Sequence, residues 1–290
     1  MTMSEGDFHL HSNYSDGIHP PATIVRMASE GGVRWMALTD HDTTDGLVEA
    51  AAAAGRVDIK LMPGIEISTD MDGVDCHLLA LGLRWHDDAW QAFLADQRDG
   101  RLGRLERMVE ILAGEGVPVR AQRVLEIAGE SSVGRPHVAR ALMEAGYVES
   151  VAEAFDRWLG NGKVADVPRE KLTPDEAIGR VHDLGGIVVV AHPPFMGPDY
   201  AVRVRALRGA GADGIETFYK NYPPEVVSAL FSLCEETGAV ASGGSDYHGL
   251  GNPDDRPVGG FEFPAEHLRR FIAYCEDHCA IPWIEEVPVA

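Results

Sequence analysis

Short apolar runs alternate along the chain with longer segments in which apolar residues recur at the spacing of a helix face. The runs predict strands at residues 7–11, 35–39, 59–67, 76–81, 187–191, 214–217 and 239–242. Helices are expected between most of them. One is opened by Pro-Pro at 20–21 and closed by Gly-Gly at 31–32, and another begins at the capping sequence Thr-Pro-Asp-Glu at 173–176. The alternation is typical of strands joined by crossover helices in a parallel sheet, and about seven such units suggest a barrel.

Residues 97–167 interrupt this alternation. The stretch is helical in pattern throughout, lacks a strand-like apolar run and carries many arginines, whereas the rest of the chain is acidic. We therefore expect a small helical subdomain inserted between a first part of the barrel, residues 1–96, and a second part, residues 168–290. Its first helix carries an arginine at every third position, namely Arg98, Arg101, Arg104 and Arg107. This row is either a solvated helix face or a contact surface for an anionic ligand.

The composition is that of a globular protein, because 45% of the 290 residues are hydrophobic and 24% are charged. The formal net charge of -21 at pH 7 disfavours general electrostatic binding to nucleic acid or anionic lipid, so a polyanionic ligand needs a local positive centre. No apolar run is long enough for a membrane span, no export signal is recognised, and the four cysteines are interpreted as reduced thiols. These features favour a cytoplasmic protein without a membrane partner.

The strand predicted at residues 7–11 has the sequence Asp-Phe-His-Leu-His. Alternate side chains of a strand point the same way, so His9 and His11 share one face with Asp7 and are placed to chelate one metal ion. The polar loop at residues 12–17 brings a carboxylate, Asp16, back toward the same end. A single His-x-His pair is weak evidence, and the loop strengthens it.

Other predicted strands deliver histidine or a carboxylate at the same rim, where enzymes of barrel architecture place their sites. Together with the first strand, six elements contribute, with Asp40, His41 and Asp42, then Glu66, His77 and His192, and finally Asp246 and His248. Any one of these residues is compatible with a structural role. Together they predict a metal centre, because burying so many imidazoles and carboxylates without a counter-ion carries a high desolvation cost.

In this order, the motifs H-x-H-S-x-x-S-D-G, T-D-H-D, P-G-I-E-I-S, an isolated histidine, A-H-P and G-S-D-Y-H resemble the polymerase and histidinol phosphatase (PHP) family of metal-dependent phosphoesterases. The resemblance covers nearly the whole chain apart from the helical insertion. It implies an α/β fold, a distorted seven-stranded (βα)7 TIM-like barrel, with three divalent metal ions. The implied ligands are His9, His11, Glu66 and Asp246 for one ion, Asp16, His41 and His248 for a second, and Glu66, His77 and His192 for a third.

The implied ligands narrow the choice of metal. Six imidazoles with three carboxylates and no thiolate favour Mn²⁺, Fe²⁺ or Zn²⁺ over Mg²⁺ and Ca²⁺, and we expect Mn²⁺. The ions supply the positive centre that an acidic protein needs for a phosphate, and a hydroxide between two ions would attack phosphorus in line. Asp7 and Asp40 have no metal in this scheme. Each is expected to orient a ligand histidine or, for Asp40, to shuttle a proton.

The insertion contains a second candidate anion site. At residues 131–137, Ser-Ser-Val-Gly-Arg-Pro-His places capping serines, including Ser132, at a helix start whose free amides suit a phosphate. Arg135 and His137 would add donors, although a plain capped helix explains the segment equally well. The segment is similar to the G-R-P-H-x-A-x-x-L of PHP proteins that act on nucleotides with phosphates at both ends or on 5'-phosphorylated RNA. That similarity also implies substrate contacts for Arg101 and Arg104.

We therefore expect a phosphoric monoester hydrolase that removes the 3'-phosphate of nucleoside 3',5'-bisphosphates such as adenosine 3',5'-bisphosphate. Phe218, Tyr219 or Tyr222 would stack on the base, or else pack in the core. A 5'-3' exonuclease on short RNA or single-stranded DNA is the main alternative, although the net charge disfavours long polymers. Further alternatives are a histidinol-phosphate-type phosphatase, a hydrolase of carbon–nitrogen bonds and a non-catalytic nucleotide sensor. The expected partner is a small nucleotide, and no protein partner is implied.

Overall fold

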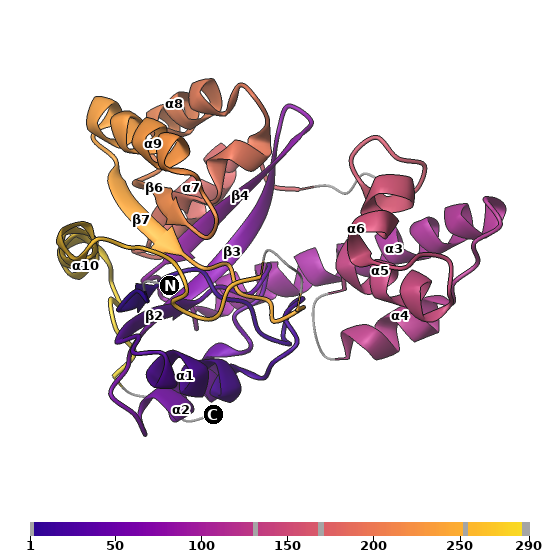
Figure 1. Cartoon of the computed structure of the whole chain (residues 1–290), viewed down its shortest axis with the longest axis horizontal. Coiled ribbons are helices and arrows are strands. Elements are labelled where there is room, and N and C mark those ends of the chain that lie inside the picture. Colours follow the sequence, from indigo (N-terminus) through magenta and orange to yellow (C-terminus); the bar gives the residue numbers. More distant parts are fainter. Residues whose placement is uncertain (1–2, 130–132, 168–170, 252–254, 286–290) are drawn as a thin grey trace.

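The computed structural model describes residues 3–129, 133–167, 171–251 and 255–285. Within these residues seven strands form one sheet, in which each strand pairs with the next along the chain. They are β1 (Gly6–Asp7), β2 (Trp35–Leu38), β3 (Lys60–Met71), β4 (Val74–Leu81), β5 (Ile187–Val190), β6 (Gly214–Tyr219) and β7 (Val240–Gly244). The chain after β1 also meets β7, since the Phe8 amide donates to the Gly243 carbonyl at 3.2 Å. The sheet is thus a nearly closed barrel (Figure 1), which confirms the expected α/β barrel.

The fourth strand corrects the expectation of an entirely parallel sheet. β4 runs antiparallel to both β3 and β5, whereas the other neighbouring strands are parallel. Only Asp72 and Gly73 separate β3 from β4, and both have positive φ, 55° and 83°, as in a two-residue hairpin turn. A connection this short has no room for the crossover that parallel strands need. As a result, the beginning of β4, with His77, lies at the same rim as the carboxyl ends of the other strands.

The first strand is shorter than predicted. Regular pairing ends at Asp7, and beyond it the Leu10 amide donates to the Thr39 hydroxyl at 3.0 Å instead of to a ladder partner. The predicted alternation of side chains nevertheless holds. Phe8 and Leu10 are buried in the apolar core, and His9 between them points into the polar cluster at the rim.

Helices cover the outside of the barrel (Figure 1). They are α1 (Pro21–Glu30), α2 (Leu47–Ala54), α7 (Pro174–Asp183), α8 (Tyr200–Ala210), α9 (Pro224–Thr237) and α10 (Ala265–His278), with a short 3-10 helix, η2 (Pro193–Met196), after β5. Two ends confirm the predicted signals, since α1 begins at a proline and Thr173 and Glu176 form a reciprocal capping box at α7. No helix among the described residues combines the length and the apolarity that a membrane crossing requires.

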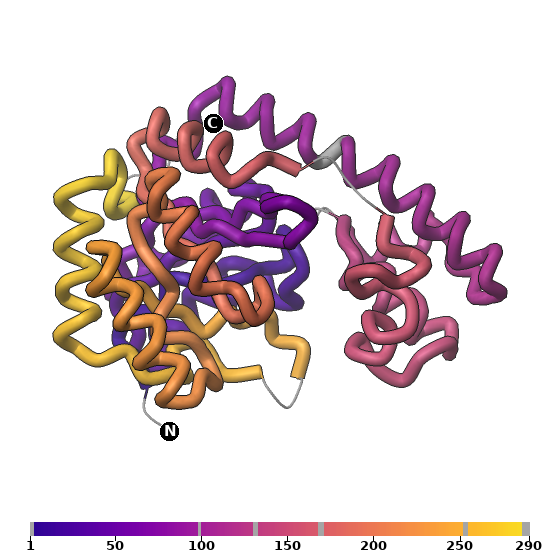
Figure 2. The backbone as a smooth tube through the Cα atoms, turned by 90° about the horizontal axis from the view of Figure 1, so that it is seen from above, coloured from indigo at the N-terminus to yellow at the C-terminus, as the bar shows by residue number. Residues whose placement is uncertain are grey.

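One long helix connects the barrel to the helical insertion. α3 (Asp88–Gly114) starts where Trp90 and Leu94 join the barrel core and runs outward (Figure 2). The remaining helices are α4 (Ala121–Ala128), α5 (Arg135–Glu144), α6 (Val151–Ala154) and a short π-helix, η1 (Phe155–Leu159). Together with α3 they enclose a separate hydrophobic cluster with side chains such as Leu112 and Leu142. The boundaries at residues 97 and 167 stay predictions, and the first of them falls within α3.

Gly244, at the end of β7, lies where the last strand closely approaches the chain that follows the first strand. A Cβ at Gly244 would lie 2.3 Å from the Cβ of His9 and 2.9 Å from its backbone nitrogen. We expect Gly244→Ala to lower the free energy of unfolding by about 1–3 kcal/mol, because the overpacked strands must shift. The matched change Gly209→Ala in α8 meets no atom within 4 Å and should raise the stability by up to about 1 kcal/mol. Thermal unfolding measures both, and equal melting temperatures would contradict the close contact.

Candidate metal centre

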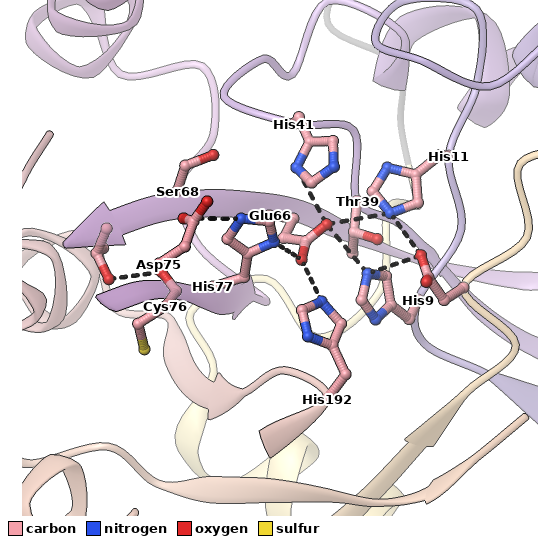
Figure 3. Close-up of polar contacts among 12 residues, drawn as sticks. His9, His11, Thr39, His41, Glu66, Ser68, Asp75, Cys76, His77 and His192 are labelled. Carbon is pink, nitrogen blue, oxygen red and sulfur yellow. Dashed lines mark hydrogen bonds and ion pairs between the residues drawn. The ribbon is translucent and has the colours of Figure 1, made fainter. Parts of the chain in front are cut away.

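The carboxylate of Glu66 lies at the centre of a cluster of imidazoles (Figure 3). It comes from the middle of β3 and is 1% exposed, whereas the histidines come from β4 and from the chain that follows β1, β2 and β5. Oε1 lies 2.8 Å from Nδ1 of His77 and 3.0 Å from Nε2 of His192, and Oε2 lies 3.1 Å from Nε2 of His9, Nε2 of His11 and Nδ1 of His41. Five imidazoles thus surround one buried carboxylate.

Two further carboxylates complete the cluster. Asp246, after β7, places Oδ1 3.1 Å from Nε2 of His11 and 3.4 Å from Nε2 of His9. Asp16, in the loop after β1, places Oδ1 3.2 Å from Nε2 of His248. Donor atoms within 4.8 Å of one another form four overlapping groups, which are His11-Asp16-His41-His248, His9-Glu66-His192, His9-His11-Asp246 and His41-Glu66-His77. The structure therefore brings together all nine residues that were predicted as ligands.

The ligands predicted for each single ion agree in part with these four groups. The set of Asp16, His41 and His248 stays together, and His9, His11 and Asp246 form a group that lacks Glu66, the fourth member of their predicted set. Glu66 belongs to two groups, as a bridging ligand does, but His77 and His192 fall into different groups that each contain it. The assignment of ligands to particular ions, and the number of ions, stay predictions.

The donor set fits divalent cations. Both ring nitrogens of His11 and Nδ1 of His41 are buried without a hydrogen bond of acceptable geometry, although carboxylate oxygens lie 3.1 Å from Nε2 of His11 and from Nδ1 of His41. Buried ring nitrogens need a hydrogen-bond partner or a metal. Imidazole nitrogens combined with carboxylate oxygens are typical ligands of transition metals. The residues present are therefore suited to hold divalent metal ions.

Burial and charge oppose each other in the cluster. Burial disfavours the ionised form of Glu66, yet neighbouring histidines, His41 foremost, hold the pKa of Glu66 well below its usual value. Burial likewise disfavours a charged His11, but Asp246 and Glu66 raise its pKa to about 10. For His41 burial prevails and lowers the pKa to about 4. The carboxylates thus draw positive charge into the site, and a metal ion would replace protons when it binds.

Unfavourable backbone conformations accompany three of the strand ends at this rim. His192, just after β5, has a φ of 27°, and Asp246, just after β7, has a φ of 46°. Asp42, next to His41, has a φ of 52°. Positive φ is uncommon for residues other than glycine and is concentrated at functional sites. Sharp local turns therefore redirect the chain where the cluster residues leave their strands.

Among the described residues, Asp7 accepts hydrogen bonds from backbone amides and none from an imidazole ring, which corrects one expectation. Its carboxylate accepts hydrogen bonds from the amides of Ser245 at 2.9 Å and Gly259 at 2.8 Å. Burial raises the pKa of Asp7 to about 6. Asp7 therefore ties β1 to the chain around β7 and supports the closure of the barrel.

Asp40 also acts through the chain rather than through a ligand ring. It accepts hydrogen bonds from the amide and hydroxyl of Ser12, both at 2.7 Å, and from the hydroxyl of Ser15 at 2.6 Å. Within the described part of the chain, these hydrogen bonds come from serines and none comes from an imidazole ring. Asp40 instead fixes the loop that carries Asp16, while proton transfer by Asp40 stays a prediction.

Glu216 in β6 is a site residue that was not predicted from the sequence. It is fully buried, its Oε1 accepts a hydrogen bond from Nδ1 of His9 at 2.8 Å, and its Oε2 accepts one from the His192 amide at 2.6 Å. A carboxylate behind a metal-binding imidazole fixes the orientation and tautomer of the ring. The available signal was a charged residue inside an otherwise apolar strand, where burial demands a partner.

A cavity of about 220 Å³ joins the metal cluster to the insertion. Its lining includes the cluster residues Asp16, His41 and His77, the cations Arg101, Arg104, Arg135 and Lys171, and the ring of Phe155. Cations beside a metal cluster suit a ligand with more than one anionic group. Ser132, also predicted to contact substrate, lies outside the described residues.

Asp75 connects the cations of this cavity with the metal cluster. Its carboxylate lies 3.1 Å from Nη2 of Arg135, 2.6 Å from Nζ of Lys171 and 3.3 Å from Nε2 of His77. Burial opposes ionisation, but His77 and Lys171 hold the pKa of Asp75 well below its usual value. Asp75 therefore holds two cations at the cavity. Lys171 was not predicted from the sequence, because a lone lysine before a capping sequence forms no motif.

The other predicted substrate contacts are engaged within the protein. Arg101 forms a buried ion pair with Asp42, and Nε of Arg104 donates to a backbone carbonyl at 2.6 Å. Nδ1 of His137 accepts a hydrogen bond from the Gly134 amide at 3.0 Å, and burial lowers the pKa of His137 to about 4. His137 is thus a neutral part of the α5 cap. Arg101 attaches the insertion to the barrel, whereas Arg104 bonds to Val167 within the insertion, and both arginines line the cavity.

The aromatic candidates for base stacking divide between core and rim. Phe218 is 6% exposed and stacks on Phe263 with centroids 5.0 Å apart, so for this residue the core alternative is confirmed. Tyr219 donates its hydroxyl to Oδ2 of Asp246 at 2.6 Å and thereby supports the metal cluster. Tyr222 packs on Tyr219, with ring centroids 4.8 Å apart.

Known proteins match this chain in sequence over most of its length. The family model for the PHP domain matches residues 7–130. A 3',5'-nucleoside bisphosphate phosphatase of Chromobacterium violaceum is 32% identical over 253 residues, which cover 86% of this chain and 89% of the relative. A 5'-3' exoribonuclease of Haemophilus influenzae is 34% identical over 245 residues, which cover 83% of this chain and 89% of the relative.

The fold of this chain is also similar to that of a solved structure. A crystal structure from Bifidobacterium adolescentis, described as a metal-dependent phosphoesterase, superposes with a TM-score of 0.82 at 30% identity and covers 92% of this chain and 95% of its own. A barrel with imidazoles and carboxylates gathered at one rim defines a metal-dependent hydrolase. The chain belongs to the PHP family and is a PHP phosphoesterase.

Glu216 allows a test of the metal site that does not depend on turnover. Glu216→Gln keeps the size of the side chain and removes the charge that faces His9. We expect the affinity for Mn²⁺ to fall about 10- to 100-fold, as is typical when a group that supports a metal ligand is changed. Calorimetric titration of the metal-free protein measures this affinity. Glu225→Gln, at an exposed position of α9, is the control, and equal affinities in the two variants would refute the supporting role.

Proposed function

We propose that the protein removes the 3'-phosphate from nucleoside 3',5'-bisphosphates such as adenosine 3',5'-bisphosphate. Three divalent ions, Mn²⁺ in preference to Fe²⁺ or Zn²⁺, would bind to the nine cluster residues, with Glu66 as the bridging ligand. The substrate is thus a small nucleotide with phosphates at both ends. The C. violaceum relative carries the name of this activity, which supports the choice of substrate.

The observation that carries the proposal is the cavity that the metal cluster shares with the cations. Asp16 and His77 face the same space as Arg135 and Lys171. A bisphosphate has two anionic groups joined by a ribose, so one group meets the metals while the other meets the cations. Arg135 supplies a planar fork that matches phosphate oxygens. Because the protein carries a net charge of -21, its attraction for phosphate has to be local in this way.

The chain's own residues position the reacting groups. Bound divalent ions would supply an activated water and neutralise charge on the phosphate. Glu216 fixes the ring of His9, and Asp40 fixes the loop that carries Asp16. Arg135 and Lys171 would hold the second phosphate, so that the first is presented to the cluster in one orientation.

A 5'-3' exonuclease on short RNA or single-stranded DNA is the second candidate. The cation-lined cavity would then hold the 5'-phosphate of the terminal nucleotide, and the H. influenzae relative carries the name of such an activity. The acidic net charge disfavours long polymers, which need a basic track. A histidinol-phosphate-type phosphatase is disfavoured because its small substrate carries a single phosphate and would not use the cation-lined part of the cavity.

The cation-lined cavity predicts which substrates depend on Arg135. Arg135→Ala should lower kcat/KM for adenosine 3',5'-bisphosphate about 10- to 100-fold, because a charge-assisted hydrogen bond contributes about 1.5–3 kcal/mol. Adenosine 3'-monophosphate lacks the second phosphate and should be affected much less. Steady-state phosphate release measures both. Arg123→Ala, an exposed arginine of α4, is the control, and an equal loss for both substrates would contradict the proposed clamp.

The metal cluster predicts that activity is lost with its ligands or its metals. His9→Ala removes an imidazole that lies within 3.4 Å of both Glu66 and Asp246, so hydrolysis should fall to background. Treatment with a chelator should have the same effect on the unaltered protein, and added Mn²⁺ should restore it. His86→Ala, at an exposed position, serves as the control. Full activity of His9→Ala would exclude this cluster as the active site.

A further inference from the structure

A second cleft, of about 500 Å³, lies on the β6–β7 side of the metal cluster. Its lining includes four aromatic residues, Phe218, Tyr219, Tyr222 and Phe261, and polar residues such as Asn221 and Arg256. Tyr219 separates the cleft from the cluster, because its hydroxyl donates to Asp246. The cleft therefore begins one side chain away from the cluster, whereas the cation-lined cavity lies toward the insertion.

Phe195, in η2, extends the aromatic lining toward the cluster. Its side chain is 65% exposed, its ring stacks on His192 with a centroid distance of 4.8 Å and an angle of 29°, and it meets Tyr219 edge-on at 5.8 Å. An exposed ring beside a site offers a flat apolar face to a planar ligand. Tyr222, in the cleft itself, buries a hydroxyl that has no hydrogen-bond partner among the described residues.

Cationic and amide groups accompany these rings. Nζ of Lys220 donates to the Asp246 carbonyl at 2.5 Å and lies 5.7 Å from the ring centre of Tyr219. Nε of Arg256 donates to the side chain of Asn221 at 2.6 Å. Aromatic faces with nearby cations and hydrogen-bonding groups are what an unpaired nucleotide requires, since the base stacks and the backbone is anionic.

We propose that Phe195 and this cleft bind the nucleobase on the 3' side of the scissile phosphate. The proposal rests on the proposed function, because it places the scissile phosphate at the metal cluster. With the 5'-phosphate held at Arg135, the nucleoside beyond the scissile phosphate extends away from the insertion, toward β6. A nucleoside 3',5'-bisphosphate has no such nucleoside. The cleft therefore binds oligonucleotides only, and it determines the preference of the enzyme between oligonucleotides and nucleoside bisphosphates.

The ratio of two activities tests this assignment. We would measure kcat/KM for a 5'-phosphorylated dinucleotide and for adenosine 3',5'-bisphosphate. Stacking of one base contributes about 1–3 kcal/mol, so Phe195→Ala should lower the dinucleotide-to-bisphosphate ratio about tenfold. Phe195→Trp, which keeps a stacking face, should preserve the ratio. Val202→Ala in α8 is the matched control, because Val202 is also 65% exposed.

Fluorescence tests the stacking without turnover. A dinucleotide with 2-aminopurine as its second base should lose fluorescence on binding to the unaltered protein, because stacking quenches this base. Phe195→Ala should remove most of that quenching. A dinucleotide with 2-aminopurine as its first base should respond alike in both proteins.

The outcomes separate the subsite from the proposed function. A ratio that Phe195→Ala leaves unchanged would overturn the subsite, and so would an equal loss for both substrates, which is expected if Phe195 merely supports His192. Hydrolysis of the bisphosphate but not of the dinucleotide would also overturn the subsite and leave the proposed function intact. Hydrolysis of the dinucleotide but not of the bisphosphate would overturn the proposed function and leave the subsite intact. If neither is hydrolysed, the proposed function fails, and the quenching of the second base decides the subsite by itself.

Discussion

The buried carboxylate of Glu66 among five imidazoles is the interaction on which the rest of this structure depends. An isolated carboxylate with 1% exposure would be strongly destabilising, and compensation requires positive charge in contact with it. Those charges come from segments separated by more than a hundred residues, from His9 to His192. The barrel has to close before the site exists, so fold and function share one constraint. Asp7 shows this link directly, because it ties β1 to the chain around β7 next to the cluster.

The insertion solves a different problem, which is how an acidic protein attracts a phosphate. Its arginines are not free surface charges, since Arg101 pairs with Asp42 and Arg135 with Asp75. Each pair joins the insertion to a residue beside the metal cluster, at His41 or His77. The same ion pairs therefore hold the insertion in place and keep cations at the cavity. Both pairs are largely buried, so the cost of removing their charges from water offsets much of their attraction, and their main effect here is on the position of charge.

The features that could be predicted are those that depend on residues close together in the sequence. The apolar runs located all seven strands, and the alternation at residues 7–11 placed His9 and His11 on the polar side, because both patterns depend only on neighbouring residues. The direction of β4 was missed, although the Asp-Gly turn before it is a hairpin signal. Glu216 was missed because its function comes from a partner 207 residues away. The partners of Asp40, two serines in another loop, were not predicted for the same reason.

By itself the sequence determined the chemical inventory of the site, since the order of histidines and carboxylates at strand ends is written in the chain and identifies the family. Tertiary structure decided how that inventory is used. Only the closed barrel shows that Glu66 lies among five imidazoles, that Asp75 joins Lys171 and Arg135 to His77, and that Phe195 lies exposed beside the cluster. The reason is physical, because burial and electrostatic interaction depend on distances in space, which separation along the chain does not fix.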